Sequence, residues 1–234
     1  MPYRWIHYQN NLYEGINPSC FILALFLIMG SCTTQRSIVD KPIIFNEQRT
    51  ALTKEYLKQR YNLNQDTPKI LPKMIVLHWT AIPTFEKSFE AFLVPTLPNW
   101  RPDIESVSGL NVSSHFLVDR DGTIYRLMPE TTMARHVIGL NHCALGVENV
   151  GGTKDTPLTR KQRLANIWLV KYLASKYAID YVIGHHEYIR FENHPLWLEV
   201  DEGYRTTKTD PGPEFMKKVR SATKKFNFKS IPNQ

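Results

Sequence analysis

The chain has 234 residues, which is enough to bury one sizeable hydrophobic core or two small ones. Hydrophobic residues make up 42% of it and charged residues 22%, a composition that excludes a wholly disordered chain. The net charge of +7 favours anionic partners such as nucleic acid, lipid headgroups or acidic wall polymers. No recognised nucleic-acid-binding motif accompanies the basic residues, so we expect no nucleic-acid partner.

The N-terminal region has the pattern of an export signal. Residues 21–29 form an unbroken apolar run, which is too short to span a bilayer as a helix but fits the apolar region of a signal peptide. Small residues and Cys32 follow, and residues 29–32 resemble a bacterial lipobox. The resemblance implies a signal peptide over residues 1–31 and a lipid on Cys32. The alternative is a cleaved signal without a lipid.

Lipidation would anchor the mature protein to a membrane on its periplasmic side. Thr33, directly after the lipidated cysteine, is compatible with the outer membrane of a Gram-negative cell. Removal of Cys20 with the signal would leave Cys143 as the one cysteine able to pair, so we expect no intrachain disulfide. Cys143 is then most simply a small buried residue.

The segments after the signal predict a tether, two helices, a strand and a loop. Residues 32–46 mix polar residues and proline without a clear period, which indicates a tether. Residues 47–61 have the apolar spacing of a helix, and residues 73–79 form an apolar run typical of a buried strand. A short helix is expected over 85–93. The proline-containing residues 95–112 predict a long loop, which in a compact domain is usually functional or mobile.

Further strands are expected in the middle of the chain. Residues 115–119 and 123–127 flank an Asp-Gly turn and predict a β-hairpin. Residues 144–150 and 180–184 predict two more strands, the second of which ends at His185.

The C-terminal part predicts two helices. Thr159 and Gln162 form a capping-box pattern that opens a helix through Tyr177. The core contacts expected from this helix are Leu164, Ile167, Trp168 and Ala174. We expect a second long loop over residues 190–209 and a basic helix over 214–226. A basic tail follows over 227–234.

Strands that alternate with helices, plus one hairpin, predict an α/β fold. We expect a single domain over residues 47–226, with a central mixed β-sheet flanked by helices. The sequence contains no internal repeat.

Two histidines and one aspartate are candidate metal ligands. His78 lies in a predicted strand, and His185 lies at the end of another. The adjacent His186 could be the ligand in place of His185, but successive strand residues face opposite sides, so we do not expect both to bind. Asp210 precedes a proline, which favours extended backbone, so Lys208 and Asp210 should point to the same side. Zinc hydrolases hold the metal with three side chains and leave a position for water. Spacing alone does not distinguish this site from core histidines and a surface ion pair.

Five segments, in this order, resemble those of a known family: residues 75–81, 113–125, 145–148, 183–185 and 208–213. The sequence resembles the zinc-dependent N-acetylmuramoyl-L-alanine amidases of the type-2 class, which are related to phage amidase lysozymes and peptidoglycan recognition proteins. Within that class it is most similar to the exported, lipid-anchored bacterial amidases.

The resemblance implies a zinc site at one end of the sheet, with the ligands His78, His185 and Asp210. It further implies that Glu148 handles the proton of the attacking water and that Lys208 stabilises the developing oxyanion. His136 matches a histidine at the rim of the cleft, where it would contact substrate. Ser114 stands where some phage members have a catalytic tyrosine, which places this sequence with the members that use glutamate.

The expected function is therefore hydrolysis of the amide bond between N-acetylmuramic acid and L-alanine in peptidoglycan or muropeptides, by a monomer active in wall turnover or recycling. Three alternatives stay open. The first is a non-catalytic peptidoglycan-binding module, although such relatives usually lack a metal ligand. The second is a cytoplasmic amidase specific for anhydro-muropeptides, which the apolar leader disfavours. The third is a structural zinc protein, which would need a fourth ligand.

Several residues have two interpretations from sequence alone. His115 and His142 are candidates for a second layer around the metal or for substrate contacts, and His115 is equally a candidate core residue. The aromatic side chains of Trp100, Trp197 and Tyr204 lie in the two long loops, where they could stack on sugars or pack against the loops themselves.

Overall fold

The computed structural model describes residues 36–99, 104 and 106–233. The predicted signal peptide (1–31), Cys32 and Trp100 lie outside the described residues. Across the part of the chain that is described, no helix combines the length and the apolar character needed to cross a membrane. The elements, in chain order, are β1 (Ile38–Asp40), α2 (Glu47–Tyr61), β2 (Met74–Leu77), α3 (Phe85–Leu93), β3 (Phe116–Val118), β4 (Ile124–Arg126), β5 (Ala144–Asn149), α5 (Arg160–Lys176), β6 (Tyr181–Gly184), η1 (His185–Phe191), α6 (Pro213–Thr223) and η2 (Lys224–Phe226).

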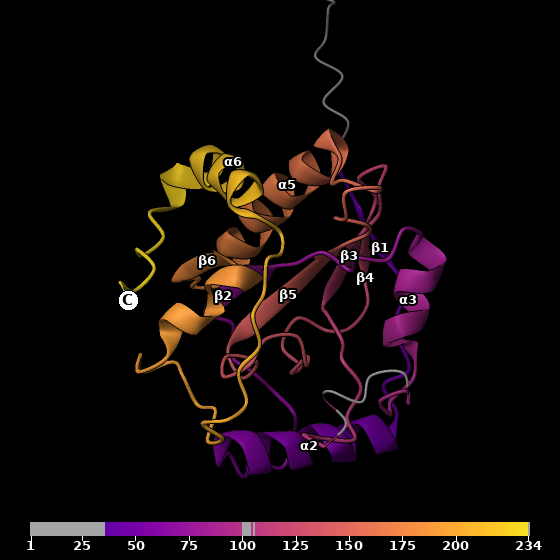
Figure 1. The fold of residues 1–234 in the computed structure, drawn as a ribbon, viewed down its shortest axis with the longest axis vertical. Helices are drawn as coiled ribbons and strands as arrows, with labels where there is room; N and C mark the ends of the chain where they lie inside the picture. The colour runs from indigo at the N-terminus through magenta and orange to yellow at the C-terminus, as the bar shows by residue number, and fades with distance from the viewer. Residues whose placement is uncertain (1–35, 100–103, 105, 234) are drawn as a thin grey trace, which may run out of the picture. The chain divides into compact units, whose positions relative to one another are not determined.

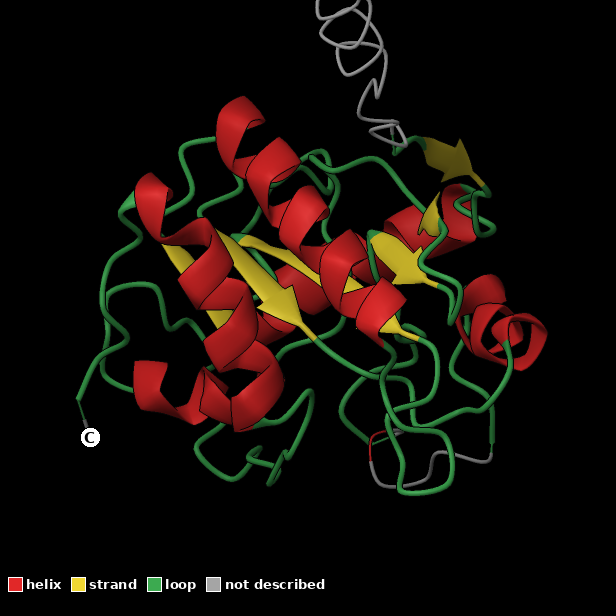
Figure 2. Ribbon diagram, turned by 90° about the horizontal axis from the view of Figure 1, so that it is seen from above, coloured by secondary structure: helices red, strands yellow, loops and turns green. Residues whose placement is uncertain are grey.

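Six strands form one mixed sheet in the order β1-β4-β3-β5-β2-β6. The β3–β4 hairpin is the antiparallel pair, and the other neighbouring strands run parallel. Helices α5 and α6 lie side by side against one face of the sheet, and α2 lies beyond its other face (Figure 1). Figure 2 looks down on the helices that cover the first face. The predicted α/β fold, a single domain with a central mixed sheet flanked by helices, is confirmed.

The two faces of the sheet follow from strand alternation. Ile75 and Leu77 of β2 pack in the core cluster under α5 and α6. Met74 and Val76 point the other way and pack in a second cluster with residues 137–140 and η1. The even-numbered side of β2 is therefore the side on which His78 emerges.

Helix α5 begins and ends as predicted, and of its expected core contacts Ile167 and Trp168 pack partly buried against the core, whereas Leu164 does not. Thr159 caps it with a complete capping box. Leu164 is 38% exposed, because the polar residues Gln162 and Asn166 face the sheet instead. Gln162 Nε2 donates to the carbonyl oxygen of Val150 (2.8 Å), and Asn166 Nδ2 donates to Asn149 Oδ1 (2.7 Å). The buried apolar residues of α5 are Ala165, Leu169, Val170 and Leu173.

The folded domain extends past its predicted limits at both ends. Part of the predicted tether is β1, which pairs in parallel with β4 at the edge of the sheet. Ile43, also in that segment, is buried. At the other end, Lys229 N donates to the carbonyl oxygen of Asp180 (2.8 Å), and Arg190 Nε donates to that of Pro232 (2.8 Å). These hydrogen bonds make both segments part of the domain.

Arg49 of α2 holds the end of α3. Its fully buried side chain donates from Nη2 to the carbonyl oxygens of Phe92 (2.8 Å) and Leu93 (3.3 Å). The last carbonyls of a helix have no partner within it, and a cation there also interacts favourably with the helix dipole. Burial lowers the pKa of Arg49 to about 10, so the guanidinium stays charged at neutral pH. This contact fixes α3 relative to α2.

Replacement of this guanidinium tests its contribution. We expect Arg49→Met to lower the free energy of unfolding by about 2 to 4 kcal/mol, because buried carbonyls lose a charged donor. Lys58→Met removes an exposed cation from the same helix and should change stability by less than about 0.5 kcal/mol. Urea denaturation measures both, and equal losses in the two variants would contradict the role of Arg49.

Candidate metal centre

Three neighbouring strands carry the site at their carboxyl ends. The last residue of β2 lies opposite Val147 of β5 and Gly184 of β6. The next residue along each strand is His78, Glu148 or His185, so these three residues stand at one level, on the face away from α5 and α6. The register thus places two imidazoles and a carboxylate from distant parts of the chain side by side.

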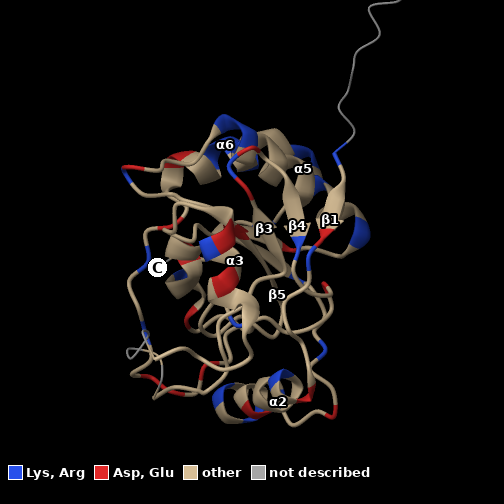
Figure 3. Ribbon diagram, turned by 90° about the vertical axis from the view of Figure 1, so that its right-hand side faces the viewer, with Lys and Arg blue, Asp and Glu red and all other residues tan. Residues whose placement is uncertain are grey.

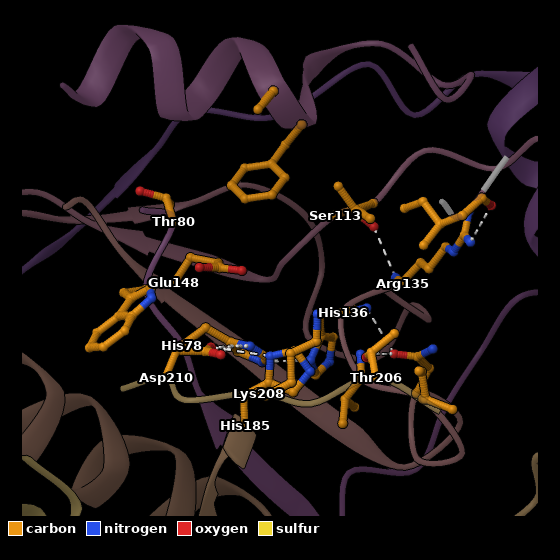
Figure 4. A pocket seen from close by; sticks show the side chains of 18 of the residues that line it. His78, Thr80, Ser113, Arg135, His136, Glu148, His185, Thr206, Lys208 and Asp210 are labelled. Carbon is orange, nitrogen blue, oxygen red and sulfur yellow. Dashed lines mark hydrogen bonds and ion pairs between the residues drawn. The ribbon is translucent and has the colours of Figure 1, made fainter. Parts of the chain in front are cut away.

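Asp210 completes a cluster with the two histidines. Its Oδ2 lies 3.1 Å from Nδ1 of His185 and 3.3 Å from Nδ1 of His78. All three residues are buried, and one ligand atom from each lies within 4.8 Å of the others. Zinc bonds of about 2.0–2.2 Å imply ligand separations of about 3.3–3.6 Å in a tetrahedral site. The cluster therefore fits a metal ion held by two imidazoles and a carboxylate, and Figure 4 shows the three side chains converging.

A pocket of about 430 Å³ opens over this cluster. Glu148 and Lys208 line it together with the three candidate ligands (Figure 4). Lys208 and Asp210 thus reach the same pocket, as expected for alternate residues of an extended segment. Its outer walls include Tyr56 of α2 and Phe92 of α3, so the helix pair joined by Arg49 borders the pocket.

Comparison with known proteins identifies the family. A family model described as N-acetylmuramoyl-L-alanine amidase matches residues 64–213. The chain belongs to this amidase family. The endolysin of Escherichia phage T7 is 34% identical over 83 residues, which are 33% of this chain and 55% of the endolysin, so the match spans about half of that relative. The N-acetylmuramoyl-L-alanine amidase LysC from Clostridium intestinale URNW superposes with a TM-score of 0.50 at 22% identity, covering 83% of this chain and 100% of that one, which shows a shared fold.

His136 orients the ring of His78. His136 Nε2 lies 3.2 Å from the carbonyl oxygen of Ala144 and must donate to it. Burial, with His78 and His115 nearby, keeps the pKa of His136 well below its usual value, so the ring is neutral. Its Nδ1 therefore accepts a hydrogen bond from the N–H at His78 Nε2, 3.0 Å away. This leaves a lone pair on His78 Nδ1, the atom that faces Asp210.

Gly146 makes room for the ring of His136. A Cβ atom at position 146 would lie 2.8 Å from that ring and 2.9 Å from Ser114 Oγ, closer than real Cβ contacts allow. Ser114 itself is buried, and its hydroxyl donates to the carbonyl oxygen of Phe116. The serine that lines the pocket is its neighbour, Ser113.

His186 positions the aspartate instead of binding beside it. Its backbone N–H donates to the carbonyl oxygen of Asp210 (2.9 Å), and its Nδ1 lies 2.9 Å from the same oxygen. Of the two adjacent histidines, His185 is therefore the one in the cluster. Neither the contact of His136 nor that of His186 follows from sequence spacing. The signal for the first was Gly146, a glycine inside a strand, which often marks a close approach.

The charges of the cluster suit a metal. Burial lowers the pKa of His185 to about 4, and His78 nearby contributes in the same direction. Burial alone would raise the pKa of Asp210, but the neighbouring rings of His185 and His78 outweigh it and hold this pKa well below its usual value. Neutral imidazoles and an ionised carboxylate are the forms that bind metal.

The structure decides between the two interpretations of several residues. His115 is a core residue, because its Nδ1 accepts from Gly146 N (3.0 Å) and its Nε2 donates to the carbonyl oxygen of Thr132 (2.8 Å). His142 packs edge-on against Tyr61. The buried Cys143, the free thiol of the described residues, fits its expected packing role. Tyr204 lines the pocket, whereas Trp197 stacks on Tyr188.

Removal of the second imidazole tests the orientation of the first. We expect His136→Ala to weaken zinc binding about 10- to 100-fold, because His78 loses the partner that fixes its tautomer. Competition with a chelating dye measures the affinity. His142→Ala removes a histidine outside the cluster and should leave the affinity unchanged. Unaltered zinc binding in His136→Ala would show that His78 needs no such support.

Proposed function

We propose that this protein is a zinc-dependent N-acetylmuramoyl-L-alanine amidase, which hydrolyses the bond between N-acetylmuramic acid and the L-alanine of the stem peptide. The observation that carries the proposal is the convergence of two histidines and an aspartate in a pocket that also holds a carboxylate and an ammonium group. Membership of the amidase family supports the same activity.

His78, His185 and Asp210 are the proposed zinc ligands. When bound, zinc supplies a water molecule acidic enough to attack an amide at neutral pH. The donors agree with this use, since zinc prefers imidazole nitrogen and carboxylate oxygen. Among the described residues, the group that could hold a metal ion consists of these three side chains. Three protein ligands are typical of a catalytic zinc site, whereas a structural site has four.

Glu148 is the proposed general base and acid. It stands beside His78 in the sheet register and lines the pocket without belonging to the cluster of ligands. A carboxylate in that place takes a proton from the attacking water and delivers it to the nitrogen of the departing L-alanine. Without that delivery the amine would leave as an anion, which is a far poorer leaving group.

Lys208 is the proposed oxyanion stabiliser. Its ammonium group reaches the pocket from the same extended segment as Asp210. As the carbonyl oxygen of the scissile amide gains negative charge, a fixed cation nearby lowers the energy of the transition state by a few kcal/mol, typically about 3. A peptidoglycan-binding module without turnover would need neither Glu148 nor Lys208 in this pocket, which favours the enzyme over that alternative.

Two substitutions separate chemistry from metal binding. We expect Glu148→Gln to retain zinc and to lower kcat by about 10²- to 10⁴-fold, because the proton has no carrier. His78→Ala should lose zinc and activity together. Metal analysis is combined with identification of the peptide and glycan products released from purified sacculi.

Glu90→Gln, an exposed carboxylate on α3, is the matched control and should behave as the unmodified protein. Near-normal turnover by Glu148→Gln would refute the proton-transfer role. Retention of full zinc content by His78→Ala would refute the ligand set.

We further propose that the enzyme is exported and anchored by a lipid on Cys32 to the periplasmic side of a membrane, expected to be the outer membrane. The apolar run at 21–29 and the lipobox-like residues 29–32 support this location. There it would act as a monomer on peptidoglycan or muropeptides during wall turnover or recycling.

Loss of the lipid acceptor should release the protein. We expect Cys32→Ser to abolish incorporation of a labelled fatty acid in bacterial cells and to reduce the share of the protein in the membrane fraction. Cys143→Ser removes a buried thiol and should alter neither. Equal labelling of the Cys32→Ser variant and the unmodified chain would rule out this lipidation site.

A further inference from the structure

Helices α5, α6 and η2 concentrate the positive charge of the molecule. Together they contain ten basic residues and one acidic residue, a net charge of +9. The whole chain has a net charge of +7, so everything else carries −2. Exposed basic side chains of these helices that form no described salt bridge are Arg160, Lys161, Lys217, Lys218, Lys224 and Lys225, which we call the basic face.

The basic face is poorly neutralised within the described part of the chain, where the nearest interaction with a carboxylate is that of Lys161, which helps to lower the pKa of Asp121. Two other cations of these helices do form ion pairs, Lys176 with Glu130 and Arg220 with Glu187. None of the six side chains of the basic face takes part in a described ion pair. Gathered like charges repel one another, so this surface is stabilised by any anionic surface laid against it.

The basic face points away from the pocket. Helices α5 and α6 pack on the sheet face that holds Ile75 and Leu77, whereas His78 emerges on the other. Figure 3 shows lysine and arginine gathered on α5 and α6. A partner bound to this surface therefore leaves the entrance of the pocket free for substrate.

Apolar and aromatic groups accompany the charges on α5. Leu164 is 38% exposed, and the partly buried Trp168 stacks on Tyr172 with ring centroids 5.5 Å apart. Rings with one apolar and one polar end, set among lysines, suit the headgroup region of a bilayer. A soluble polyanion would find charge here but would gain nothing from Leu164.

Arg36, the first residue that the structure describes, lies near the first turn of α5. Arg36 Nη1 donates to the carbonyl oxygen of Gly122 (3.1 Å), and a Cβ at Gly122 would lie 2.9 Å from the carbonyl oxygen of Lys161. Cys32 is four residues before Arg36, a span of at most about 14 Å. A lipid on Cys32 would hold the first turn of α5 close to the bilayer, and this step rests on the lipidation proposed above.

We propose that the basic face lies against anionic phospholipid headgroups of the membrane that carries the anchor. The lipid and the basic face then act as two membrane signals on one side of the domain, and the pocket opens toward the wall. One lipid chain with a basic patch binds far more firmly than either alone.

The test uses full-length chains with Cys32→Ser, so that no lipid contributes. Sedimentation with vesicles of phosphatidylglycerol and phosphatidylethanolamine is compared with sedimentation with phosphatidylcholine vesicles, which cancels any effect of the apolar leader. The basic-face triple variant carries Lys161→Glu, Lys217→Glu and Lys218→Glu. The control triple carries Lys58→Glu, Lys69→Glu and Lys87→Glu, which are exposed lysines on other elements. Each triple lowers the net charge from +7 to +1.

We expect the Cys32→Ser parent chain to bind the anionic vesicles more strongly than the phosphatidylcholine vesicles. In the basic-face triple the ratio of the two affinities should fall by at least about tenfold. The control triple should keep it within about twofold, because distant charges are screened at physiological salt. A second basic-face triple with glutamine at the same positions should lose most of the preference as well, which excludes an effect of the new carboxylates. Thermal melts check that all variants fold.

Equal losses in the basic-face and control triples would overturn the proposal, as would a parent chain without any preference. Loss of binding to purified sacculi with vesicle binding intact would assign the basic face to an anionic wall polymer and overturn it equally. Amidase activity on soluble muropeptides should be unchanged in the basic-face triple. A parent chain without that activity would refute the proposed function and leave the vesicle result standing.

Discussion

Parallel pairing of β2 with β5 and β6 is the constraint on which the site depends. Parallel strands place their carboxyl ends at one edge of the sheet, and a register set by backbone hydrogen bonds fixes which side chains stand beside one another there. His78, Glu148 and His185 reach one level in this way although more than a hundred residues separate the first from the last. Asp210 then needs only an extended approach from outside the sheet.

Polar contacts behind the site give it rigidity. His136 holds His78, and His186 holds the backbone of Asp210. Arg49 fixes the helix pair that forms the outer wall. Each contact satisfies a buried polar group that would otherwise cost free energy, so the same hydrogen bonds that stabilise the fold keep the side chains of the cluster in place.

Hydrophobic periodicity and turn residues were sufficient to predict the main helices and strands, because the alternation in β2 and the cap at Thr159 are local properties of the sequence. On α5, Ile167 and Trp168 were correctly predicted to pack against the core, but Leu164 was not. Gln162 and Asn166 are buried instead, through hydrogen-bond partners that only the tertiary structure supplies. Strand β1 was not predicted for a similar reason. Its three residues at the edge of the sheet are too few to show the alternation of a strand. The ligand set had no compact spacing and depended on family resemblance, while the geometry now places its members together.

The missing side chain at position 146 has a consequence for variation among related sequences. The ring of His136 occupies the volume that any larger residue would need, so the two positions cannot vary independently. A homologue with alanine or serine in place of Gly146 should have exchanged the imidazole at 136 for a smaller group, and would have to orient the imidazole at position 78 by some other acceptor. Paired substitutions at these two sites would therefore mark a branch of the family with a differently supported metal.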